Sequence, residues 1–202
     1  GSLATLDEFR KVLMKSSVLH LAMHSFSDTA DSRYSYLQFW SSDSAGNGGR
    51  LFNYEISLSD MNSPMVVLSS CSSGTGRMYS GEGMMSLARS FILAGAMSVV
   101  RTSWEVNDEI SGQVIKMFYK RLSEGYSRDE SLRLAKLDYL RHRSPNYAHP
   151  YYWAAYELTG DNSPLESKEN KNGYVIPVLI ISGGFLVFFY FSRRSTASAS
   201  RL

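Results

Sequence analysis

The chain has 202 residues, of which 44% are hydrophobic and 20% are charged, enough for one domain with a core and an additional segment. A formal net charge of +2 gives no electrostatic reason to expect a nucleic-acid partner. The single cysteine excludes an intramolecular disulfide and supplies too few thiols for a structural zinc site. His142 and His149 have no partners at ligand spacing, so we expect neither a metal nor a cofactor.

The N-terminal part of the chain predicts a helix, a strand and a hairpin. Residues 3–15 repeat apolar side chains every three or four positions, which indicates a short amphipathic helix. Residues 17–24 form an apolar run that indicates a buried strand, with His20 packed in the core and His24 at the strand's exit. Within residues 36–56, two aromatic-rich runs flank a segment of glycine and asparagine, which predicts a β-hairpin.

The middle of the chain predicts a parallel strand that ends at the single cysteine. Residues 65–70 are apolar and then small and polar, as in a buried strand that runs out into a loop. Cys71 stands at this exit, where α/β proteins gather ligands and chemistry. A helix over residues 81–94 and a strand over residues 96–104 then complete a crossover that we expect to be right-handed.

The rest of the domain predicts two helices and a last strand. A second exit loop, residues 104–108, leads into a helix with its apolar face over residues 110–122. Ser127 and Glu130 fit a capping box at the start of the next helix. Residues 151–159 are rich in aromatic side chains and predict the last strand.

The composition changes after residue 161. Residues 162–173 are polar and charged, and we interpret them as a linker that cannot fold alone. Residues 174–192 are apolar and uncharged, and as a helix the run of residues 174–191 is about 27 Å long, close to the thickness of a bilayer core. We therefore expect a transmembrane helix at residues 174–192, followed by a basic tail at residues 193–202. A buried core helix and a strand-rich tail are the other interpretations.

Charges around this apolar segment suggest an orientation. Arg193, Arg194 and Arg201 follow it, whereas Lys168 and Lys171 precede it. Positive charge favours the cytoplasmic side, so we expect a cytoplasmic tail and a globular domain on the extracytoplasmic side of the membrane.

The candidate catalytic groups in the sequence are a thiol and a histidine. A cysteine attacks as the thiolate, and a nearby histidine lowers the thiol pKa and later protonates the leaving amine. His24 and Cys71 end two different predicted strands, and neighbouring parallel strands lie about 4.8 Å apart. A catalytic dyad is one interpretation of this pattern. An inert buried thiol is the other, and the residues taken alone favour it.

Five segments follow one another along the chain: Leu19–His24, Val66–Gly76, Gly81–Ala96, Ser98–Asp108 and His149–Asp161. In this order they resemble the successive motifs of the CHAT domain family, caspase-like cysteine peptidases related to separase. The resemblance implies a caspase/hemoglobinase-like α/β fold, with a mostly parallel sheet flanked by helices, in a peptidase domain over residues 1–161.

The resemblance also implies the site. It makes His24 and Cys71 the catalytic dyad, with the backbone N–H groups of Ser25 and Cys71 as oxyanion donors. Ser25 stands where the family often has glycine, and a serine has the same backbone N–H group as a glycine. The family has further strands before the histidine strand, often preceded in bacteria by tetratricopeptide repeats. We therefore expect a longer protein whose N-terminal strands are missing here, which leaves an open edge of the sheet.

Asp108 matches by position the acidic residue that separase-like relatives have in the pocket for the residue before the cleaved bond. A carboxylate in a partly desolvated pocket selects a cation and prefers arginine. We therefore expect cleavage after Arg or Lys, with Glu105 as the nearest competitor for that pocket. The other interpretation is that Asp108 caps the helix that follows it.

The sequence thus favours a membrane-anchored cysteine endopeptidase that acts on a protein or peptide and is regulated by an N-terminal repeat region. The alternative is a catalytically inactive CHAT module that serves as a scaffold or a protein-binding element.

Overall fold

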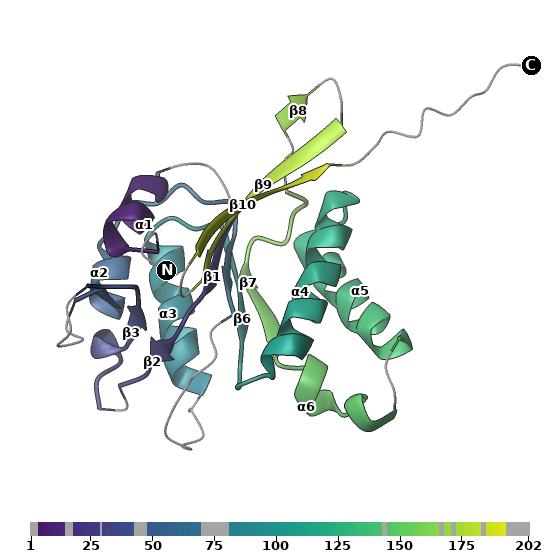
Figure 1. The fold of residues 1–202 in the computed structure, drawn as a ribbon, viewed down its shortest axis with the longest axis horizontal. Helices are drawn as coiled ribbons and strands as arrows, with labels where there is room; N and C mark the ends of the chain where they lie inside the picture. Colours follow the sequence, from purple (N-terminus) through teal and green to yellow (C-terminus); the bar gives the residue numbers. More distant parts are fainter. Residues whose placement is uncertain are drawn as a thin grey trace, which may run out of the picture.

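The protein is a layered α/β structure built on one large sheet (Figure 1). It is described here from a computed structural model, which covers residues 4–14, 18–28, 30–42, 48–69, 81–142, 145–165, 168–170, 173–182 and 185–192. The large sheet has the strand order β10-β9-β1-β5-β6-β7, and β8 pairs with β9. Its strands are β1 (Val18–Ala22), β5 (Val66–Leu68), β6 (Ser98–Thr102), β7 (Tyr156–Gly160), β8 (Lys168–Asn170), β9 (Gly173–Ser182) and β10 (Phe185–Ser192).

The centre of this sheet is parallel, as the sequence predicts. Strands β9, β1, β5 and β6 run in the same direction, whereas β7 and β10 are antiparallel to their neighbours. In the register of β1 and β5, Leu19 pairs with Val66 and Leu21 pairs with Leu68. The Ser69 N–H donates to the Leu21 carbonyl oxygen at 3.1 Å, so the pairing continues beyond the last residue of β5.

Helices cover both faces of the sheet (Figure 1). One side carries α1 (Leu6–Val12), α2 (Asn53–Ser57) and α3 (Gly81–Leu93), and the other carries α4 (Asp108–Ser123), α5 (Arg128–Arg141) and α6 (Pro150–Trp153). Two short 3₁₀ helices, η1 (Ser32–Tyr34) and η2 (Pro145–Tyr147), lie in the connections. The expected mostly parallel sheet flanked by helices is therefore confirmed.

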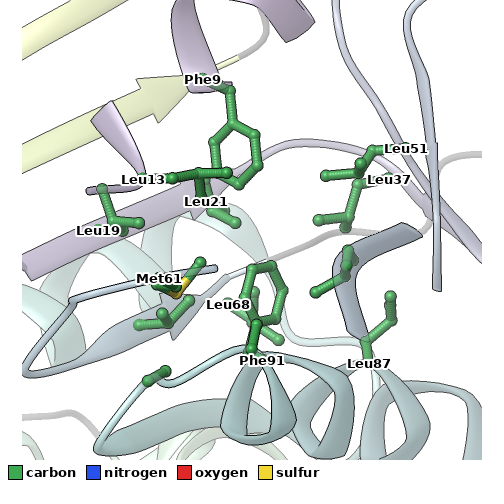
Figure 2. Packing of buried hydrophobic residues seen from close by; sticks show 14 of the residues in the cluster. Phe9, Leu13, Leu19, Leu21, Leu37, Leu51, Met61, Leu68, Leu87 and Phe91 are labelled. Atoms are coloured by element: carbon green, nitrogen blue, oxygen red, sulfur yellow. The ribbon is translucent and has the colours of Figure 1, made fainter. Parts of the chain in front are cut away.

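Side chains of β1 alternate between two hydrophobic cores because successive residues of a strand point to opposite faces. Leu19 and Leu21 belong to the core shared with α1 and α3, and Figure 2 shows Leu21 beside Phe9 and Leu13 of the N-terminal segment. Val18 belongs to the core shared with α4 and α5. The central strands are thus buried on both faces, which explains their continuous apolar sequences.

A second, three-stranded antiparallel sheet has the order β2 (Ser25–Phe26), β3 (Tyr36–Gln38) and β4 (Arg50–Phe52). Leu37 and Leu51 face each other across β3 and β4 and enter the same core as α1 and α3 (Figure 2). The expected hairpin is confirmed, but its second strand ends at Phe52. Helix α2 begins there because the Glu55 carboxylate accepts a hydrogen bond from the Phe52 N–H and closes the first helical turn.

Two local predictions in the C-terminal part of the domain were wrong. The strand expected at residues 151–159 begins only at Tyr156, because Pro150 at the first helical position and the His149 ring, which accepts from the Tyr151 N–H, start α6 instead. Ser127 is the N-cap of α5 but makes no capping bond, because its hydroxyl donates to the Asp129 carboxylate.

The segment expected to be a transmembrane helix forms two strands instead. Residues 173–182 form β9, parallel to β1, and residues 185–192 form β10, antiparallel to β9. Among the residues that the structure describes, no helix combines the length and the apolar character needed to span a bilayer. The segment is rich in Val, Ile and Phe, which favour strands, and the edge of β1 that we expected to be open gives β9 a pairing partner.

His20 is a titratable side chain buried in the sheet. It lies in β1, is 7% exposed, and its ring centroid is 5.8 Å from that of Tyr119 in α4. Burial disfavours the charged imidazolium and lowers the pKa of His20 to about 4. The expectation that His20 is a packed core residue is therefore confirmed.

Burial of His20 makes the stability of the fold depend on pH. Below pH 6.5 the unfolded chain protonates this imidazole, whereas the folded chain resists protonation down to about pH 4. The free energy of unfolding should therefore fall as the pH falls from 6.5 to 4, by about 3 kcal/mol from this group, and should not respond to it above pH 6.5. Urea unfolding of the native chain and of His20→Gln across this range measures the effect. Equal pH dependence in the two proteins would contradict it.

Two glycines should respond in opposite ways to alanine. Gly95 follows α3 at φ +110°, and a Cβ there would lie 2.3 Å from the Met61 carbonyl oxygen, so Gly95→Ala should destabilise the fold by at least about 1 kcal/mol. Gly112 lies inside α4 with nothing within 4 Å of its Cβ position, so Gly112→Ala should stabilise the fold by about 0.5–1 kcal/mol. Denaturant midpoints check both, and shifts of the same sign would be evidence against this geometry.

Candidate active site

The candidate site lies at the edge of the sheet where β1, β5 and β6 end. Because these strands are parallel, the residues that follow them gather at one edge. His24 follows β1, Ser69 follows β5, and Trp104 and Glu105 lie in the loop after β6. Cys71 lies outside the described residues. In sequence it stands as far beyond Leu68 as His24 stands beyond Leu21, and these two leucines are register partners.

His24 is exposed and is held by its backbone. Its carbonyl oxygen accepts a hydrogen bond of 2.9 Å from the Gln38 N–H, which joins the end of β1 to the small sheet. His24 therefore has a backbone fixed by a hydrogen bond and an imidazole that is accessible to solvent.

Ser25 is the first residue of β2 and is buried. It pairs with Leu37 of β3, one position after the hydrogen-bonded pair of His24 and Gln38. Hydrogen-bonded and non-hydrogen-bonded pairs alternate along an antiparallel ladder, so the Ser25 N–H points away from β3. The Ser25 N–H is therefore not one of the donors that join β2 to β3, as an oxyanion donor beside His24 requires.

The loop after β6 is fixed by contacts that the sequence did not predict. Arg101 is 4% exposed and donates to the Glu157 carboxylate at 2.5 Å and to the Ser103 hydroxyl at 3.0 Å. The Trp104 indole N–H donates to the Tyr151 carbonyl oxygen at 2.8 Å. In the sequence, these partnerships are indicated by Arg101, the charged residue within β6.

Asp108 and Glu105 are both exposed, rather than lying in a desolvated pocket. Asn107, not Asp108, caps α4, because its side-chain oxygen accepts from the Glu109 N–H at 3.0 Å and the Ile110 N–H at 3.3 Å. The interpretation of Asp108 as the helix cap is therefore wrong. Over the described part of the chain, neither the Asp108 nor the Glu105 carboxylate receives a hydrogen bond, so both remain able to bind a cation.

The remaining histidines have structural contacts. The His142 ring bonds through Nδ1 to the Asp138 carbonyl oxygen at 2.7 Å at the end of α5, and His149 caps α6. A search of the described residues finds no group of three or more His, Cys, Asp or Glu side chains suited to a metal ion.

Sequence comparisons show the family of the chain. A model of the CHAT domain matches residues 1–161. Among curated proteins, the chain is 30% identical over 116 residues to tetratricopeptide repeat protein 28 of Mus musculus and 28% identical over 116 residues to its Homo sapiens counterpart. Each alignment covers 57% of this chain but 5% of the relative. Both relatives are mammalian proteins. With the family model spanning most of its length, the chain belongs to the CHAT domain family.

Proposed function

We propose that this chain is a cysteine endopeptidase in which Cys71 is the nucleophile and His24 the general base and acid. The observation that carries the proposal is the β1–β5 pairing, which sets the strand that leads to His24 directly beside the strand that leads to Cys71. Membership of a caspase-like family supports the same pair.

The reaction follows from the chemistry of the two side chains. His24 removes the thiol proton, and the thiolate attacks the peptide carbonyl carbon. The N–H groups of Ser25 and Cys71 donate to the oxyanion that forms. When the intermediate collapses, the C–N bond breaks and the imidazolium of His24 gives its proton to the leaving amine. Water, deprotonated by His24, then hydrolyses the thioester, which releases the acid and restores the thiol.

The alternative is an inactive CHAT module that binds other proteins. The observation that favours it is the printed name of the relatives, which refers to tetratricopeptide repeats and not to a peptidase. The same names support an upstream repeat region in the whole protein, which we propose as a regulator of the site.

Removal of either member of the dyad should separate the two functions. Because Cys71 is the single cysteine, iodoacetamide labelling of the folded chain reports on this thiol alone. Cys71→Ala should abolish labelling and peptide hydrolysis, and His24→Ala should slow labelling by about tenfold or more because the thiolate loses its partner. His142→Ala, which removes a helix-end histidine, is the matched control and should leave labelling unchanged. Labelling indifferent to His24 would leave the binding module as the function.

We also propose that Asp108 selects Arg or Lys before the cleaved bond, because its carboxylate is exposed near the β6 exit and is not used to cap α4. Asp108→Ala should lower kcat/KM for an Arg-terminated fluorogenic peptide by about fivefold, the loss expected for one exposed ion pair of about 1 kcal/mol. Glu105→Ala is the matched control with a smaller expected effect. Faster turnover of an Asp-terminated peptide than of the Arg-terminated peptide would show that the preference is different.

A further inference from the structure

A buried contact joins the two strands that lead to the proposed dyad. The His20 Nε2 atom of β1 lies 2.5 Å from the Ser69 hydroxyl oxygen, just after β5. In β1, His20 stands four positions before His24, and Ser69 stands two positions before Cys71. No step of the proposed reaction uses this contact.

Burial decides which atom of the contact carries the proton. The low pKa of His20 keeps its ring neutral, so one ring nitrogen bears hydrogen and the other a lone pair. The Nδ1 atom is buried and has no hydrogen-bond partner within the described ranges. A buried donor without an acceptor costs free energy, so the hydrogen belongs on Nε2, where it meets the Ser69 oxygen. His20 therefore donates and Ser69 accepts.

This assignment leaves the Ser69 hydroxyl hydrogen directed away from His20. The Ser69 backbone is already fixed, because its N–H donates to the Leu21 carbonyl oxygen at 3.1 Å. With the side chain held by His20 as well, both the backbone and the side chain of Ser69 are bonded to β1. The Tyr119 ring of α4 packs against the His20 ring and limits its rotation.

We propose that His20 and Ser69 form a positioning pair that fixes where the chain leaves β5 and so sets Cys71 against His24. Neither residue touches the substrate in this scheme. The inference rests on the proposed function, because it gives the two buried residues a role in aligning that dyad. A contact that served only to stabilise the core would have no such effect on the thiol.

The test measures the iodoacetamide labelling rate of Cys71 and the kcat and KM of peptide hydrolysis in the full chain. Ser69→Ala and His20→Leu should each lower the labelling rate and kcat by about tenfold to a hundredfold with little change in KM, because misalignment of the reacting groups slows the chemical step. His20→Gln keeps a donor near the Nε2 position and should remain within about threefold of the native rate. The double variant should be no slower than the slower single variant, because both changes remove one contact.

Ser98→Ala is the matched control, since the Ser98 hydroxyl is buried and donates to the Pro64 carbonyl oxygen at the opposite end of the strands. It should lose stability without slower labelling, and near-UV circular dichroism checks that each variant is folded. Native labelling and kcat in folded Ser69→Ala would overturn the positioning pair and leave the peptidase proposal intact. Absent hydrolysis together with labelling that still depends on His20 and Ser69 would overturn the peptidase proposal and support the pair.

Discussion

The parallel pairing of β1 with β5 is the constraint on which the rest of this structure depends. Strand β1 leads to His24 and β5 leads to Cys71. The hydrogen bonds between the two strands begin where the Leu19 N–H donates to the Met65 carbonyl oxygen and continue to the Ser69 N–H, which donates to the Leu21 carbonyl oxygen. A slip of this register by one residue would turn every side chain of β1 to the other face. The two hydrophobic cores therefore fix the register, and the register determines which strand ends lie side by side at the edge of the sheet that carries the candidate site.

The same constraint explains why a polar side chain is tolerated in the middle of β1. His20 lies on the face towards α4, where the neighbouring side chains are apolar, and its Nδ1 is a buried nitrogen without a hydrogen-bond partner among the described residues, which costs free energy. An apolar residue of similar size would avoid this cost, and stability alone gives no reason for a histidine. The Ser69 hydroxyl is the one interaction that such a replacement would lose at the edge of the sheet.

Much of the fold follows from patterns that the sequence displays directly. Apolar runs near residues 18–22 and 65–68 predicted the central strands, and apolar residues at helical spacing predicted α3 and α4. The last segment was different, because an uncharged apolar run has no periodicity that separates a membrane helix from buried strands. Whether such a run forms β9 depends on the unpaired edge of β1, which is a tertiary feature.

The sequence predicted the strand end at which His24 lies, but not the contacts around the neighbouring strand ends. His24 could be placed from its position after an apolar run, whereas the bonds that Arg101 and Trp104 make with β7 and α6 depend on segments about fifty residues away. These bonds matter for any substrate preference at this edge. They hold the β6 exit loop against the sheet, so the exposed Glu105 carboxylate projects from a fixed loop and the exposed Asp108 carboxylate from the first turn of α4. An exposed carboxylate gains most of its selectivity when a bound peptide excludes water from it, and cation selection at this edge would therefore arise together with substrate binding.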